Sequence, residues 1–175
     1  MEEFLSRENL DLHREYLRQQ MLRYSVFEVC YPKIKDKCIS ELMHMRIGDD
    51  KEKIISMKAD IILHNVYFNS FGKRNECSTL LMQQYKSIQS FLYELYKASL
   101  EHDGFCVIYS DGERIKFSFG EALIYKIGKI QPLLAIDLRE HAYFLDYGFN
   151  KEEYLKNAVS FLNLKKIDEK MQGKH

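Results

Sequence analysis

The 175-residue sequence has no tryptophan, only two prolines and no long run of apolar residues. A helix that spans a bilayer needs about 20 consecutive apolar residues, so no membrane association is expected. Net charge is also absent, because 26 Lys and Arg residues balance 26 Asp and Glu residues. Proteins that bind nucleic acids usually present a basic surface, and this balance therefore argues against a nucleic-acid partner.

A basic, apolar leader and C-x-x-C cysteine pairs are missing as well. The first ten residues, MEEFLSRENL, are acidic and amphipathic, which predicts a cytoplasmic location. Without metal-binding spacing, the cysteines are expected to be reduced and partly buried. They are Cys30, Cys38, Cys77 and Cys106. With 46% hydrophobic and 30% charged residues, the chain can fold around a sizeable core.

Apolar residues recur at three- and four-residue spacing through the first hundred positions, which is typical of amphipathic helices. Helices are predicted at 6–29, 33–46, 51–71 and 78–100. Pro32 is expected to close the first helix, and Gly72 to follow the end of the third.

The pattern then changes to short β-prone runs. Residues 105–109 and 114–118 flank Asp111-Gly112, which predicts a hairpin with a two-residue turn. A third strand is predicted at 133–136. Two final helices are predicted at 139–147 and 151–164, the second with Asn150 as its N-cap.

Helices that precede a hairpin, a strand and further helices are typical of an α+β fold. The order predicts an antiparallel sheet of three strands in the C-terminal half. A seam near residues 72–78 divides a helical N-terminal domain, 1–74, from a mixed C-terminal α/β domain, 75–175.

The segment Asp137-Leu138-Arg139-Glu140-His141-Ala142-Tyr143-Phe144 carries the clearest chemical signal. Asp137 ends a predicted strand and His141 begins a predicted helix, so both side chains can point at one place. His13 and His64 lie on apolar helix faces. Three imidazoles and one carboxylate suit iron, manganese or zinc better than calcium. Taken singly, a buried histidine is also consistent with an ordinary core residue.

The same segment resembles the D-x-W-E-H-A-Y-Y signature of iron/manganese superoxide dismutases. Asn9-Leu10-Asp11-Leu12-His13 resembles the first-helix segment of that family, and His64-Asn65-Val66-Tyr67-Phe68 resembles its H-x-x-[FY]-W segment. Gly104-Phe105-Cys106-Val107-Ile108 stands where the family has G-W-x-W-L. With the closing-helix segment from Tyr154 to Leu164, the resemblance covers nearly the whole chain.

The resemblance implies an N-terminal helical hairpin joined to a C-terminal α/β domain, with two metal ligands from each. It implies one iron or manganese ion per chain and disproportionation of superoxide, a small-molecule substrate. The implied ligands are His13, His64, Asp137 and His141. The implied catalytic residues around them are Asp60, Tyr67 and Tyr143.

Glu140 beside His141 resembles the family glutamate that bonds the ligand histidine of a second subunit. This likeness implies a homodimer or a tetramer of such dimers. A solvent-exposed glutamate on a helix is the alternative interpretation.

Several positions depart from the family pattern. In the family, a tyrosine gates the site and relays protons, and Met21 stands in its place here. Leu17 replaces the histidine partner of that tyrosine. Gly148 replaces an arginine that steers anions toward the site. The family glutamine that bonds metal-bound solvent maps onto Asp60 or Ala122. Tryptophans that line the family's site are replaced by Phe68, Phe105, Val107 and Arg139.

Asp60 has two interpretations. Its carboxylate either bonds metal-bound solvent, which would stabilise the reduced metal, or pairs with a cation such as Arg18 or Arg139. Three functions follow for the chain: a slow dismutase, a metal carrier, sensor or other small-oxidant redox protein, or a structural module without metal. The choice between iron and manganese stays open.

Overall fold

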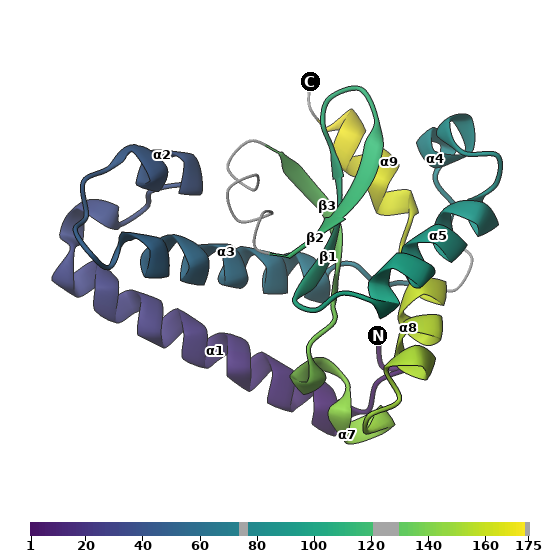
Figure 1. Cartoon of the computed structure of the whole chain (residues 1–175), viewed down its shortest axis with the longest axis horizontal. Coiled ribbons are helices and arrows are strands. Elements are labelled where there is room, and N and C mark those ends of the chain that lie inside the picture. The colour runs from purple at the N-terminus through teal and green to yellow at the C-terminus, as the bar shows by residue number, and fades with distance from the viewer. Residues whose placement is uncertain (74–76, 121–129, 174–175) are drawn as a thin grey trace.

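The computed structural model describes residues 1–73, 77–120 and 130–173 (Figure 1). The elements of these residues follow one another in this order: α1 (Arg7–Cys30), the 3₁₀ helix η1 (Pro32–Ile34), α2 (Ile39–His44), α3 (Lys51–Phe68), α4 (Thr79–Gln84), α5 (Ile88–Leu100), β1 (Phe105–Ser110), β2 (Ile115–Phe119), β3 (Gln131–Asp137), the 3₁₀ helix η2 (Glu140–Ala142), α7 (Phe144–Tyr147), α8 (Lys151–Ser160) and α9 (Lys165–Gln172).

The N-terminal half is built on the antiparallel pair α1 and α3, which η1 and α2 connect (Figure 1). Ser6 begins α1, because its Oγ accepts a hydrogen bond from the Asn9 amide at 3.1 Å. The helix ends at Cys30, shortly before Pro32. The two long helices bring one face of α1 against α3, and both candidate histidines of this half lie on those helices.

The C-terminal half contains an antiparallel sheet with the strand order β2-β1-β3. Every residue of the central strand β1 is buried, as expected for the apolar run Phe-Cys-Val-Ile-Tyr. Helices α3 and α9 pack against β3. Phe105 pairs with Asp137 at one end of the β1–β3 ladder, and this end faces the N-terminal helices.

The end of α3 is joined to the C-terminal half by hydrogen bonds from backbone amides. Ser70 Oγ accepts from the Ala135 amide at 2.7 Å, and the Ser70 carbonyl accepts from the Asn163 amide at 2.9 Å. The Gly72 amide donates to the Phe161 carbonyl at 2.9 Å. These contacts hold the end of α3 against β3 and against the segment between α8 and α9. The predicted domain boundary at residue 74 lies outside the described residues, and the division there stays a prediction.

The structure confirms the predicted α+β class, with a helical N-terminal half and a three-stranded antiparallel sheet. Asn150 caps α8, since its Oδ1 accepts from the Glu153 amide at 3.1 Å. No helix among the described residues is long and apolar enough to cross a membrane.

Two of the helices predicted in the first hundred residues are wrong in extent. The helix predicted at 33–46 is reduced to η1 and α2, because Asp36 between them has a left-handed φ of 60°. The helix predicted at 78–100 is interrupted before Ile88. There the backbone of Ser87 is extended, and its Oγ accepts from the Ser90 amide at 3.0 Å to start α5.

The other boundary errors have tertiary or turn causes. The third helix stops at Phe68 rather than 71, and Phe71 forms a β-bridge with Leu162, which also separates α8 from α9. The helix predicted at 139–147 consists of η2 and α7. The hairpin loop holds four residues rather than two, since Ser110 pairs directly with Ile115.

One consequence of this core concerns thiol chemistry. Cys106 is buried in β1, and this burial raises the pKa of its thiol to about 12. Cys30 and Cys38 are exposed. Because the thiolate is the reactive form, we expect iodoacetamide at pH 8 to modify these two cysteines and leave Cys106 unmodified. Peptide mass mapping checks this, with urea-unfolded protein as the control in which Cys106 reacts. Modification of Cys106 at the same rate in folded and unfolded protein would contradict the described core.

Candidate metal centre

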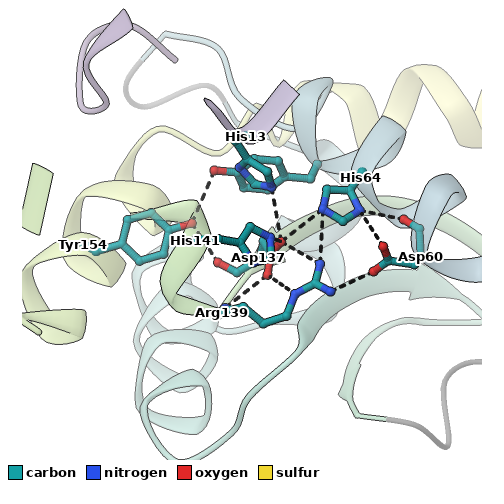
Figure 2. A network of polar contacts seen from close by, with 8 residues as sticks. His13, Asp60, His64, Asp137, Arg139, His141 and Tyr154 are labelled. Atoms are coloured by element: carbon teal, nitrogen blue, oxygen red, sulfur yellow. Dashed lines mark hydrogen bonds and ion pairs between the residues drawn. The ribbon is translucent and has the colours of Figure 1, made fainter. Parts of the chain in front are cut away.

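Four side chains from four elements meet where the two halves join. His13 comes from α1 and His64 from α3, while Asp137 is the last residue of β3 and His141 lies in η2. Figure 2 shows the imidazoles arranged around the carboxylate of Asp137. His13, His64 and Asp137 are buried, and the His141 side chain is 27% exposed. The structure therefore brings together the four residues that the sequence suggested as ligands.

The donor atoms of this cluster converge on one place. Asp137 Oδ2 lies 3.1 Å from His141 Nε2, 3.3 Å from His13 Nε2 and 3.5 Å from His64 Nε2. One ligand atom from each residue lies within 4.8 Å of all the others. Separations of this size are those of neighbouring ligands around a single ion, whose bonds to nitrogen and oxygen are about 2.0–2.2 Å long.

Local structure explains why Asp137 points into the cluster. Phe105 fixes the end of the β3 ladder beside it, and Tyr154 donates a hydrogen bond to its backbone carbonyl at 2.9 Å. The chain then turns, and the Arg139 amide donates to Asp137 Oδ1 at 3.1 Å. This turn brings His141, four residues later, back over the carboxylate.

His13 tests whether the cluster suits a metal. Its two ring nitrogens are buried and have no hydrogen-bond partner among the described residues, and the 3.3 Å approach of Nε2 to Asp137 lacks hydrogen-bond geometry. A buried nitrogen without a partner is costly, and a coordinated ion would satisfy it. Three imidazoles and one carboxylate are also the donor set that iron and manganese accept. The residues present therefore fit a mononuclear site.

The protonation states match this chemistry. Burial lowers the pKa of His13, and it lowers the pKa of His64 to about 4, so both imidazoles are neutral at pH 7. Burial alone would raise the pKa of Asp137. The close approach of His13 and the hydrogen bonds from His141 and Arg139 outweigh that effect and hold its pKa well below the ordinary range. The site thus combines neutral imidazoles with an ionised carboxylate.

Arg139 forms an ion network at the edge of the cluster (Figure 2). Its Nε and Nη2 each donate to Asp137 at 2.8 Å, a bidentate pair, and its Nη1 donates to Asp60 Oδ1 at 2.8 Å. Arg18 instead pairs with Glu15 on the surface of α1. Of the two sequence interpretations of Asp60, the structure therefore favours the ion pair and identifies its partner as Arg139.

The remaining predicted residues surround this network. Tyr67 is buried, with its ring 4.9 Å from that of His13 and its hydroxyl 3.5 Å from that of Tyr154. Tyr143 is buried and stacks on Tyr154 with ring centroids 4.7 Å apart. Glu140 is exposed. Ala122, the second possible glutamine position, lies outside the described residues.

The residues that replace the family's gate and relay differ in their surroundings. Leu17 is buried in the core, whereas Met21 is 51% exposed. Gly148 has a φ of 54° and ends α7. The side chains of Leu17 and Met21 cannot donate a proton.

Sequence reasoning missed Tyr16. Its ring stacks on His141 with centroids 4.3 Å apart and lies 5.3 Å from the ring of His64. Burial, reinforced by the charge of Asp60, raises the pKa of Tyr16, so its hydroxyl is protonated at neutral pH. The only sequence signal was its position three residues after His13, on the same side of α1.

Comparison with known proteins identifies the family of the chain. Residues 73–170, more than half of the chain, match the C-terminal domain of the iron/manganese superoxide dismutases. The chain belongs to the iron/manganese superoxide dismutase family. Asp137 and His141 lie within the matched region, whereas His13 and His64 precede it.

The chain is also similar to a curated protein, superoxide dismutase [Mn] 1, mitochondrial, of Arabidopsis thaliana. The two sequences are 43% identical over 49 residues, which cover 28% of this chain and 21% of the relative. The matched part thus spans about a fifth of the relative's length.

Proposed function

We propose that the chain is a superoxide dismutase that binds one iron or manganese ion and works slowly. The observation that carries this proposal is the convergence of three imidazoles and one buried carboxylate at the junction of the two halves. Family membership supports it, since the C-terminal half matches the superoxide dismutase domain. The proposed ligands are His13, His64, Asp137 and His141.

In this proposal, His13, His64, Asp137 and His141 would hold an iron or manganese ion, which would supply the one-electron redox chemistry. The residues of the chain orient and tune the site. Tyr154 fixes the backbone of Asp137, and the buried aromatic rings of Tyr67 and Phe105 exclude water from one side. Tyr143 supports Tyr154 from behind, as a positioning residue.

The slow rate follows from the side chains that could deliver protons or guide an anion. Met21 and Leu17 cannot donate protons, and Asp60 accepts a hydrogen bond from Arg139. The net charge of zero provides no overall attraction for superoxide. Tyr16 is the phenol that packs directly on the partly exposed ligand His141, and we propose it as the remaining proton donor.

The test is a superoxide-consumption assay on protein loaded with iron or with manganese. We expect metal-dependent consumption, slower than that of family members that keep the tyrosine and glutamine. His64→Ala should abolish it, with Glu15→Gln on the surface of α1 as the matched control. No consumption by the metal-loaded protein would reject the dismutase.

A metal-binding protein without dismutase activity is the second candidate. The ion pair of Asp60 with Arg139 favours this candidate, because the pair occupies the carboxylate that would otherwise bond metal-bound solvent. Full metal binding without superoxide consumption is the outcome that this candidate predicts.

We also propose that the chain forms a homodimer across the surface around η2 and α7, with a tetramer as a further assembly. Glu140 is exposed there, next to His141. Phe144, Leu145 and Phe149 of the same surface are 43%, 51% and 83% exposed. Such an apolar group is typical of a surface that a partner covers.

Glu140→Ala tests the assembly. In the proposed dimer, this carboxylate orients the ligand histidine of the partner chain, so its loss should weaken metal affinity by about 10–100-fold and shift the protein toward monomer. Sedimentation velocity at micromolar concentration and metal titration measure the two effects. Glu113→Ala, in the hairpin loop, is the matched control. Wild-type protein that sediments as a monomer would contradict the proposal.

A further inference from the structure

His64 has a single lone pair available for binding. Its Nδ1 lies 2.8 Å from the backbone carbonyl of Asp60, and a carbonyl can only accept a hydrogen bond. Nδ1 therefore carries the ring proton. The neutral imidazole then has its lone pair on Nε2, the atom that faces the cluster.

A guanidinium group already approaches that lone pair. Arg139 Nη2 lies 3.3 Å from His64 Nε2 and 2.8 Å from Asp137 Oδ2. All guanidinium nitrogens are donors, so the contact with His64 uses the lone pair on Nε2. One lone pair cannot serve both a guanidinium donor and a metal ion.

The surroundings of Arg139 hold the guanidinium there and also offer it room to move. Asp60 anchors Nη1 at 2.8 Å, and the ring of Phe105 lies beneath the guanidinium at 4.5 Å. A cavity of about 360 Å³ opens on the same side and is lined by Asp60, Phe105, Gly104 and Arg139, among others. The guanidinium can therefore withdraw toward the cavity while it keeps its bond to Asp60.

We propose that Arg139 is a resident cation that competes with the metal ion for His64 Nε2 and Asp137 Oδ2. Metal binding then requires the guanidinium to withdraw toward Asp60 and the adjacent cavity. The arginine thereby weakens metal affinity, since its positive charge also stays close to the bound ion. This inference rests on the metal site proposed above and assigns to Arg139 the control of its affinity.

The experiment is a titration of chelator-treated protein with Mn²⁺ alone, in which isothermal calorimetry measures the binding. Arg139→Gln removes the competing cation, but it also leaves Asp60 unpaired, which by itself would attract a metal ion. The double variant Asp60→Asn/Arg139→Gln removes one charge of each sign and isolates the competition. We expect the double variant to bind Mn²⁺ about 10–100-fold more tightly than wild type, the range typical of residues that contact metal ligands. Arg18→Gln, which removes a surface arginine, is the matched control and should bind as wild type does.

Arg139→Lys provides a second route if the uncharged variants do not fold. Lysine keeps the charge but cannot bond Asp60, Asp137 and His64 at once, so Mn²⁺ affinity should again rise. Equal affinity in wild type and in the folded variants would overturn the role of Arg139 while leaving the metal site intact. Binding by none of the proteins would overturn both proposals.

Discussion

Asp137→Asn is expected to lower the free energy of unfolding of the metal-free protein by about 3–5 kcal/mol, the cost typical of breaking a buried ion pair. Asp137 is fully buried and accepts two hydrogen bonds from the Arg139 side chain and one from the Arg139 amide. Asparagine has nearly the same shape but no charge. The guanidinium would lose its bidentate partner, and an amide nitrogen would face donors.

Urea unfolding followed by circular dichroism, with a chelator present, measures this effect. Asp111→Asn is the matched control, because Asp111 pairs with Lys116 in an exposed hairpin and such surface pairs add little stability. Metal titration of the same variants should show no binding for Asp137→Asn. A midpoint equal to that of wild type would contradict the ion network at the centre of the fold.

Tyr16→Phe is expected to slow superoxide consumption by about 10²–10⁴-fold, the usual cost of losing a positioned proton donor. The substitution keeps the ring that stacks on His141 at 4.3 Å and removes only the hydroxyl. Metal content and stability should therefore stay close to those of wild type. The effect should lie in the rate of the metal-loaded protein.

Stopped-flow measurement of superoxide decay checks this prediction over a range of pH. Tyr93→Phe is the control, since Tyr93 is 62% exposed on α5, in the C-terminal half. An unchanged rate for Tyr16→Phe, at equal metal content, would show that protons reach the site from solvent without help from this phenol.

Periodicity and turn signals predicted the elements that are long or locally capped. The helix predicted at 6–29 is α1, and the hairpin strands lie within one residue of β1 and β2. Some of the failures lie where distant contacts compete with local preference. Residues 161–164 continue a helical pattern, but their backbone bonds to Ser70 and Gly72 end α8. No local signal carries that information.

Local sequence patterns also predicted part of the candidate site. The spacing of Asp137 and His141 across a strand-to-helix turn is a local pattern, and the resemblance supplied the two helical histidines. The pairing of Asp60 with Arg139 joins residues 79 positions apart, so the sequence could offer it only as one of two choices. The stacking of Tyr16 on His141 joins residues still farther apart in the sequence and was not anticipated.

The most direct test of the central claim is the metal stoichiometry at saturation, measured by elemental analysis after anaerobic loading with Fe²⁺ or Mn²⁺ and removal of free ions. Wild type should retain close to one ion per chain, and His64→Ala should retain almost none while its circular dichroism spectrum stays that of a folded protein. Undiminished metal in His64→Ala, or no metal in wild type under either condition, would contradict the assignment of these four residues as a metal site.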